Sequence, residues 1–332
     1  MDHCPPEIQI KIFALACIDG GRTGCALSRV SRHIRATSSP VRFYTISLHG
    51  ILRMRLFLEI ARQRFSCPKV THLFLYDGGR EGLPYFGENA LAVVISIVSM
   101  FSPFLRTLSG SLKSVGATYS SLFPPGTDLS SLQELSLDVH PMHESNAVLP
   151  NLPALRLLHK WGKIRGRRGI LDVDAVVGVA PKLAHIRFSG LDQARVFPVM
   201  LGTALKHDFP GSEGVPKLRL PDCLEQILIQ CVFVDDRGWC GTDSMIYCDI
   251  QVKLSILAAA HEKVVILPES DYTVEDCMVD WLEIAEGGEG WRRNPPRKIA
   301  STLVHERDPT GQPKQRDRSI PREISRKLLA IR

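Results

Sequence analysis

The sequence predicts an α/β protein in three parts: a short helical unit, a repetitive array of helices and parallel strands, and a basic tail. Residues up to about 48 show helical periodicity and almost no strand signal. From about 50 to 286, helical stretches alternate with short strand-like pieces, which favours parallel pairing. Residues 288–332 are rich in proline and basic side chains, which is typical of a solvated tail with at most a short helix near its end. The expected boundaries are therefore 1–48, 49–287 and 288–332.

The first helix is expected to have more apolar surface than its own unit can cover. Pro5, Pro6 and Glu7 favour a helix start. The residues that follow form two apolar sets, Ile8, Ile12, Leu15 and Ala16 on one face and Ile10, Phe13 and Cys17 on another. A unit of about 40 residues has too small a core to bury both. One face must pack on the rest of the chain or on a partner protein.

The array is predicted from leucine-type residues at x-x-L-x-L spacing. The strand-like pieces are expected at 70–75, 105–108, 132–137, 152–157, 183–188, 224–229 and 264–267. Helices are expected at 50–65, 89–101, 172–179, 194–205 and 249–261, and a last one from the Thr273–Asp276 capping box to Gly287. Stacked units of this kind bury a continuous core and expose a strip of strand edges and loops. The alternative is a compact α/β domain with leucine-rich strands.

The N-terminal pattern resembles a known module. It reads Pro5-Pro6-Glu7-Ile8-x-x-x-Ile12-Phe13-x-x-Ala16, then Ala26-Leu27-Ser28-Arg29-Val30-Ser31-Arg32-x-Ile34-Arg35. Over residues 4 to about 46 it resembles an F-box, the three-helix adaptor-binding module of SCF (cullin–RING) ubiquitin ligases. Cys4 and Ile34 depart from the Leu and Trp common in that family, and the loop from Asp19 to Gly24 is glycine-rich. The array behind it resembles the leucine-rich repeats of many F-box proteins, with a longer, irregular step than the usual 20–29 residues.

The resemblance implies a non-catalytic substrate-recognition subunit of an SCF ubiquitin ligase, located inside the cell in the cytoplasm, the nucleus or both. Its partners would be the adaptor, a cullin reached through the adaptor, and a target protein held by the array. Matched residue by residue, the adaptor contacts would be Pro6, Ile8, Ile12, Phe13, Leu27 and Val30. Two other readings stay open: a protein-interaction scaffold with a vestigial F-box, and a basic-ended protein associated with nucleic acid.

The sequence offers little support for an enzyme or a metal site. It contains no phosphate-binding Gly-x-x-x-x-Gly-Lys-Ser/Thr loop, no Gly-x-Ser-x-Gly and no His-Glu-x-x-His. Cys223, Cys231, Cys240 and Cys248 lie seven or eight residues apart, whereas zinc ligands usually come in closely spaced pairs. We therefore expect no catalytic residues, no metal and no cofactor.

The charge distribution, the longest apolar stretch and the cysteines bear on which partners and which cellular compartment to expect. Residues 1–69 and 287–332 each carry a net charge of +7, and residues 70–286 carry −8. An acidic body argues against nucleic acid as the main partner. The longest apolar stretch, Leu91 to Leu105, is too short to span a membrane. Nine scattered cysteines favour a reducing compartment.

A basic cluster stands out within the array: Lys160, Lys163, Arg165, Arg167 and Arg168, interleaved with glycines beside Trp161. It is expected to be either a solvated loop between repeats or a recognition loop for an acidic or phosphorylated partner, because arginine clusters bind phosphate through charge-assisted hydrogen bonds.

Overall fold

The computed structural model describes residues 4–63, 69–78, 88–140, 149–164, 168–192, 194–210, 214–215, 218–232 and 242–292. Contacts divide the chain into two compact units, Met1–Gly290 and Trp291–Arg332. The expected boundary at residue 48 falls inside the first unit. The expected tail lies, from residue 293 on, outside the described residues.

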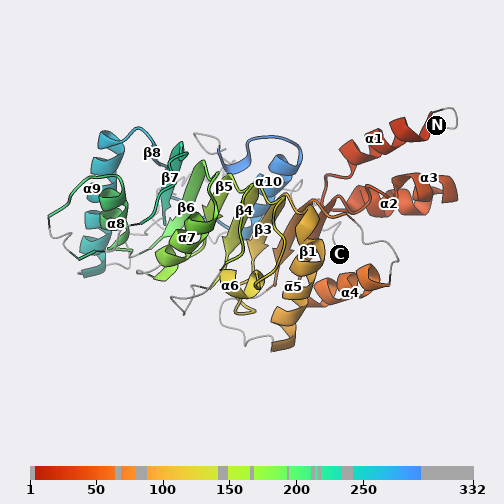
Figure 1. The fold of residues 1–332 in the computed structure, drawn as a ribbon, viewed down its shortest axis with the longest axis horizontal. Helices are drawn as coiled ribbons and strands as arrows, with labels where there is room; N and C mark the ends of the chain where they lie inside the picture. The colour runs from red at the N-terminus through yellow and green to blue at the C-terminus, as the bar shows by residue number, and fades with distance from the viewer. Residues whose placement is uncertain are drawn as a thin grey trace, which may run out of the picture. The chain divides into compact units, whose positions relative to one another are not determined.

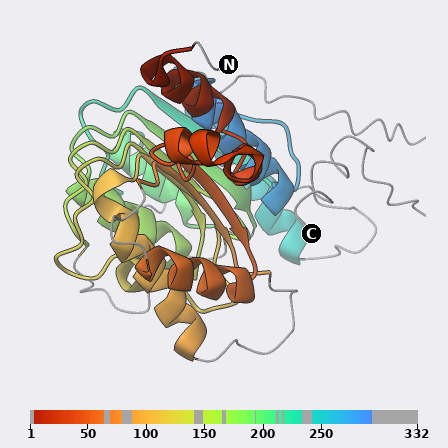
Figure 2. The ribbon, with the colours of Figure 1, turned by 90° about the vertical axis from the view of Figure 1, so that its right-hand side faces the viewer.

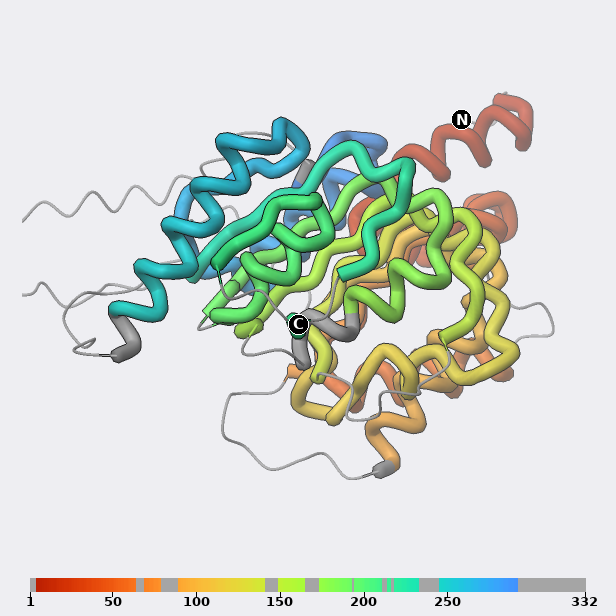
Figure 3. Tube along the Cα trace, turned by 60° about the vertical axis from the view of Figure 1, so that its left-hand side comes forward, coloured from red at the N-terminus to blue at the C-terminus, as the bar shows by residue number. Residues whose placement is uncertain are grey.

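A parallel sheet is the frame of the first unit. In the described part of the chain it has eight strands, and their order in the sheet is their order in the sequence. They are β1 (Thr45–His49), β2 (His72–Tyr76), β3 (Thr107–Ser111), β4 (Glu134–Asp138), β5 (Leu157–Lys160), β6 (His185–Leu191), β7 (Gln226–Cys231) and β8 (Val264–Ile266). A doubly wound sheet would reverse its strand order part-way. The α/β class and the parallel pairing are confirmed, and the consecutive order is compatible with a solenoid (Figures 1 and 3).

Helices cover both faces of the sheet unequally. Those of the array are α4 (Ile51–Arg62), α5 (Glu88–Phe101), α6 (Tyr119–Leu122), α7 (Arg168–Val179), α8 (Phe197–Ala204), α9 (Thr242–Ala260) and α10 (Val274–Ala285), with short 3₁₀ turns at Ser102–Phe104 and Gly290–Arg292. Helices α4 to α9 pack along one face and supply the main core. Helix α10 packs on the opposite face with a separate aromatic cluster (Figure 1).

One aliphatic row crosses the whole sheet and builds the main core. Neighbouring strands are in register at Ile46, Leu73, Leu108, Leu135, Leu158, Ile186, Ile227 and Val264. All eight side chains are buried beneath the helices. Fully burying one such side chain stabilises a fold by about 1.5–3 kcal/mol, so this row holds successive coils together. The apolar residue that opens most of the predicted pieces, such as Leu105 or Leu132, is buried just before the strand, which explains why most strands begin about two residues later than expected.

The N-terminal part contains a strand that the sequence analysis did not predict. Helices α1 (Pro6–Ala16), α2 (Arg22–Val30) and α3 (Arg32–Ser38) form the helical unit, but the chain then enters β1 before residue 49. The unit and β1 are joined directly, because the Ser47 amide donates to the Gly20 carbonyl oxygen at 3.2 Å. Gly24 allows this close packing, since a Cβ there would lie 2.2 Å from the Arg42 carbonyl oxygen. The expectation of a purely helical segment over residues 1–48 is therefore wrong at its end.

Candidate functional site

Helix α1 buries a polar residue and exposes large apolar ones, the opposite of what an amphipathic surface helix normally does. Its inward side carries Phe13 and Cys17 but also the polar Gln9, which is 2% exposed. The Gln9 amide donates to the Cys4 carbonyl oxygen at 2.8 Å, and its oxygen lies 3.2 Å from His33 Nε2 on α3. Burying an amide costs free energy unless it is hydrogen-bonded. These two hydrogen bonds therefore compensate the burial of Gln9 on the inward side of α1, where an apolar residue would need none.

The outward side of α1 is apolar. Ile8, Ile12 and Leu15 fall at i, i+4 and i+7, and are 45%, 45% and 76% exposed. We call these three residues the α1 stripe. Figure 2 looks along the sheet from this end, with α1 (darkest red) above the other two N-terminal helices. A helix that hides a glutamine and displays three large aliphatic side chains has a surface suited to a partner.

The six residues expected to contact an adaptor differ in their exposure to solvent. Pro6, Ile8, Ile12 and Val30 are exposed and Leu27 is half-buried. Phe13 is 3% exposed and lies inside the helical unit with Ile34 of α3. We therefore correct its expected place: Phe13 holds the unit together and does not reach its surface. Leu15, which is not among the residues that the F-box resemblance implies for adaptor contact, is the most exposed member of the stripe.

A second candidate site lies on the face of the sheet opposite the main core. One register row there carries Phe74, Ser109, Ser136, His159 and Arg187, from β2 to β6. We call these five residues the central row. In an array whose strand face binds a target, such a row would be open to solvent. Here each of its members is 2% exposed or less.

The chain itself covers the central row. Residues 268–285, named here the crossing segment, comprise the loop after β8 and helix α10, and they run back over the sheet to β2 and β3. Helix α10 starts with the expected capping box, in which Thr273 Oγ1 accepts from the Asp276 amide and Asp276 accepts from the Thr273 amide. Small side chains at Ser109 and Ser136 leave room for it, and Cys277 Sγ lies 3.7 Å from Ser136 Oγ. The sequence predicts an exposed strip of strand edges and loops, and over the central row this face of the strands is instead buried by the chain's own C-terminal helix α10.

Aromatic packing fixes the crossing segment on the sheet. The Trp281 ring centroid lies 5.4 Å from that of Phe74, and Tyr272 lies 4.7 Å from His159 and 5.5 Å from Trp161. The Arg187 guanidinium lies 4.8 Å from the Tyr272 ring centroid. Aromatic pairs in these arrangements add about 0.5–1.5 kcal/mol each beyond their buried area.

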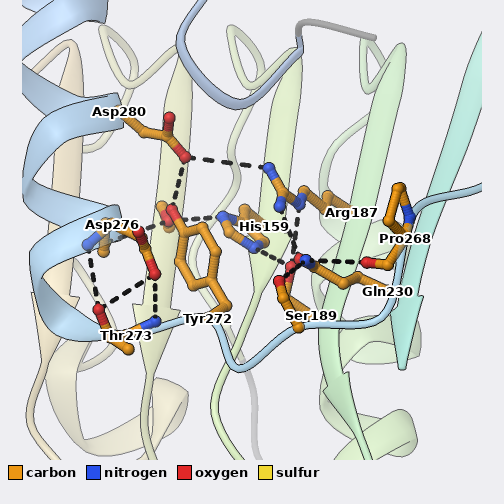
Figure 4. Close-up of polar contacts among 12 residues, drawn as sticks. His159, Arg187, Ser189, Gln230, Pro268, Tyr272, Thr273, Asp276 and Asp280 are labelled. Atoms are coloured by element: carbon orange, nitrogen blue, oxygen red, sulfur yellow. Dashed lines mark hydrogen bonds and ion pairs between the residues drawn. The ribbon is translucent and has the colours of Figure 1, made fainter. Parts of the chain in front are cut away.

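Polar groups beneath the crossing segment form a connected network (Figure 4). His159 lies 3.1 Å from Ser136 Oγ through Nδ1 and 3.0 Å from Ser189 Oγ through Nε2. Arg187 donates to Ser189 and to Gln230, at 2.9 and 2.7 Å. Gln230 in turn donates to the Pro268 carbonyl oxygen at 3.4 Å and to the Ser270 hydroxyl at 2.5 Å. The network therefore connects the sheet to the loop that begins the crossing segment.

Burial shifts the ionisation of this network. It raises the pKa of Asp280 to about 6, even though the Tyr272 hydroxyl donates to it at 2.7 Å and Arg187 lies 3.9 Å away. Burial also raises the pKa of the Tyr272 phenol well above its usual value. It lowers the pKa of His159, and the nearby Arg187 lowers it further. At neutral pH, His159 and Tyr272 are thus uncharged inside this interface.

The predicted basic loop is not assembled in the described residues. Lys160 belongs to β5 and is 3% exposed; its ammonium donates to the Val139 carbonyl oxygen at 2.9 Å and lies 5.5 Å from the Tyr119 ring centroid. Its expected place in an exposed loop is therefore wrong. Lys163 is exposed, Arg168 begins α7, and Arg165 and Arg167 lie outside the described residues.

Among the described residues, no cluster of three or more His, Cys, Asp or Glu side chains is placed to hold a metal ion. No helix in that same part of the chain is long and apolar enough to cross a membrane. Comparisons with known protein families and with curated proteins find no match.

Proposed function

We propose that this protein is a non-catalytic substrate-recognition subunit of an SCF ubiquitin ligase. The helical unit binds the adaptor, the adaptor connects it to a cullin, and the array holds the target protein. The ubiquitin-transfer chemistry belongs to the partner enzymes. The role of this chain is to raise the effective concentration of the target near them.

The observation that carries the proposal is the α1 stripe. Ile8 and Ile12 are among the residues that the F-box pattern assigns to the adaptor, and both are displayed on the surface together with Leu15. The burial of Gln9 supports the same conclusion. A helix that packs only on its own core would bury its isoleucines and leucine and expose its glutamine. Protein interfaces concentrate their binding energy in a few such apolar anchors.

The crossing segment restricts where a target binds. The central row is closed by Tyr272, Cys277 and Trp281, so the target meets the array at its loops, its helices or the outer side of α10. Arrays of this kind present several such surfaces along their length.

The proposal is tested by affinity purification of the tagged full chain followed by mass spectrometry. Recovery of an SCF adaptor and a cullin supports it, and the other recovered proteins are candidate targets. The Ile8→Asp variant serves as the matched control and should lose adaptor and cullin while retaining the targets. Recovery of nucleic acid with steep salt dependence, and of no adaptor, would favour the alternative of a nucleic-acid-associated protein instead.

A further inference from the structure

Helix α9 lies at the opposite end of the array from the helical unit and is apolar on two sides (Figure 1). Its inner side, with Ile250, Leu254 and Leu257, is buried in the main core. Its outer side carries Met245, Cys248, Val252, Ile256 and Ala259, all of them exposed. Met245, Val252 and Ile256 are 74%, 59% and 42% exposed. We call these five residues the α9 stripe.

Terminal units of a stacked array normally have a polar outer face, because no further unit covers them. The outer side of α9 does not follow this rule. From Met245 to Ala260 the sequence has only two charged residues, Asp249 and Lys253. The stripe is therefore a surface at which a partner would bury aliphatic side chains without having to bury unpaired charge.

The spacing of the stripe is symmetric about Val252. Cys248 and Ile256 lie four residues to either side of it, and Met245 and Ala259 lie seven residues to either side. An antiparallel copy of α9, related by a two-fold axis through Val252, places Val252 against Val252. The same operation places Cys248 against Ile256 and Met245 against Ala259, so that larger side chains meet smaller ones. A two-fold interface requires this kind of self-complementary surface.

The positions of Asp249 and Lys253 are compatible with the same antiparallel pairing. Asp249 and Lys253 form an ion pair at 2.7 Å within the helix and lie on one flank of the stripe. In the two-fold arrangement this flank is shared by both helices. Asp249 of one copy then lies opposite residue 255 of the other, two residues from Lys253. At 1.5 Å per residue, the positions of Asp249 and the second copy's Lys253 along the helix axis are about 3 Å apart. Each carboxylate thus lies beside an ammonium group of the second copy.

We propose that the chain forms a homodimer through antiparallel packing of the α9 stripes of two copies. The contact is small and apolar, so the dimer dissociates on dilution. It leaves the α1 stripe of each copy uncovered, because α1 and α9 lie at opposite ends of the array.

The first test is sedimentation of the full chain up to about 100 µM, a range in which a weak dimer is populated by mass action. Val252→Asp should raise the dimer dissociation constant at least about a hundredfold, because it places two unpaired carboxylates at the axis. Its melting temperature should stay close to that of the wild type, since Val252 is exposed. Leu52→Asp, at a similarly exposed aliphatic position on α4 (68% against 59% for Val252), is the matched control and should leave the dimer intact.

The second test fixes the orientation by disulfide formation in a Cys248→Ser background. Val252→Cys should link to itself on oxidation. Met245→Cys or Ala259→Cys alone should not, because equivalent residues of the two copies are then about 21 Å apart, beyond the roughly 7 Å limit of a disulfide. A mixture of the Met245→Cys and Ala259→Cys proteins should form the mixed disulfide. A monomer at every concentration, a dimer unaffected by Val252→Asp, or self-linking at both 245 and 259 would overturn the proposal.

Discussion

The Asp280 carboxylate on α10 lies 3.9 Å from the Arg187 guanidinium on β6, and both contact Tyr272: Asp280 accepts from its hydroxyl and Arg187 faces its ring (Figure 4). This contact joins the crossing segment to the centre of the sheet. Arg187 is 2% exposed and Asp280 is largely covered, so the charges meet where water is scarce. Such a pair is costly to desolvate and costly to break, which makes it a sensitive probe of whether α10 lies on the sheet in solution.

The first prediction concerns the pH dependence of this contact. The pKa of Asp280 is raised to about 6, above its value in an unfolded chain, so the folded protein binds more protons between pH 4 and 6. The contribution of Asp280 to the free energy of unfolding therefore falls as pH rises through this window, by on the order of 2–3 kcal/mol. Asn cannot ionise, so Asp280→Asn should gain stability relative to wild type over the same window in urea titrations.

Glu275→Gln is the control for that experiment, because Glu275 lies on α10 but is exposed. Its stability should follow the wild-type pH curve. Parallel pH curves for wild type and Asp280→Asn would contradict the burial of Asp280 beneath α10.

The second prediction concerns Trp281. It is 1% exposed and packs on Phe74, so Trp281→Ala should lower the free energy of unfolding by about 3–5 kcal/mol. Denaturation in urea measures this directly. Glu286→Ala, at the exposed end of the same helix, should change it by less than about 0.5 kcal/mol. Equal effects of the two substitutions would mean that α10 does not pack on the sheet.

The third prediction concerns truncation. A chain that ends at Arg292 should keep the wild-type melting temperature, because α10 and the crossing segment remain complete. A chain that ends at Leu267 should lose stability cooperatively, since Phe74 and Trp161 would be exposed and Arg187 would lose Asp280 and Tyr272. Thermal melts followed by circular dichroism distinguish the two truncated chains. Equal melting temperatures would show that the crossing segment contributes nothing to the fold.

Most of the array could be predicted from local pattern. The alternation of helices with leucine-rich strands predicts parallel pairing, and the leucine-type positions within each strand predict the side that packs under helices α4 to α9. The strand β1 shows the same signal, with Ile46 and Leu48 alternating with Thr45, Ser47 and His49. The helical periodicity of the residues before it, together with the helices that the F-box resemblance implies there, outweighs this short signal.

The crossing segment could not be predicted, because its position depends on contacts between distant parts of the chain. The capping box at Thr273 indicates where α10 begins but not which face of the sheet it covers. The small residues Ser109 and Ser136 indicate room for a helix over the sheet, but only once β3 and β4 are known to be neighbours. Likewise, the two apolar faces of α1 were evident, but burial of Gln9 between α1 and His33 decides which face is left outside.

The central claim is that the α1 stripe binds the SCF adaptor. The most direct measurement is the affinity of purified full chain for purified adaptor, for wild type and for Ile8→Asp. The account predicts binding by wild type and an affinity lower by at least about a hundredfold for Ile8→Asp, because a carboxylate would be buried in the contact. Leu52→Asp should bind normally, and all three proteins should melt alike, since Ile8 and Leu52 are both exposed. No binding by wild type, together with a loss of folding in Ile8→Asp, would contradict the account.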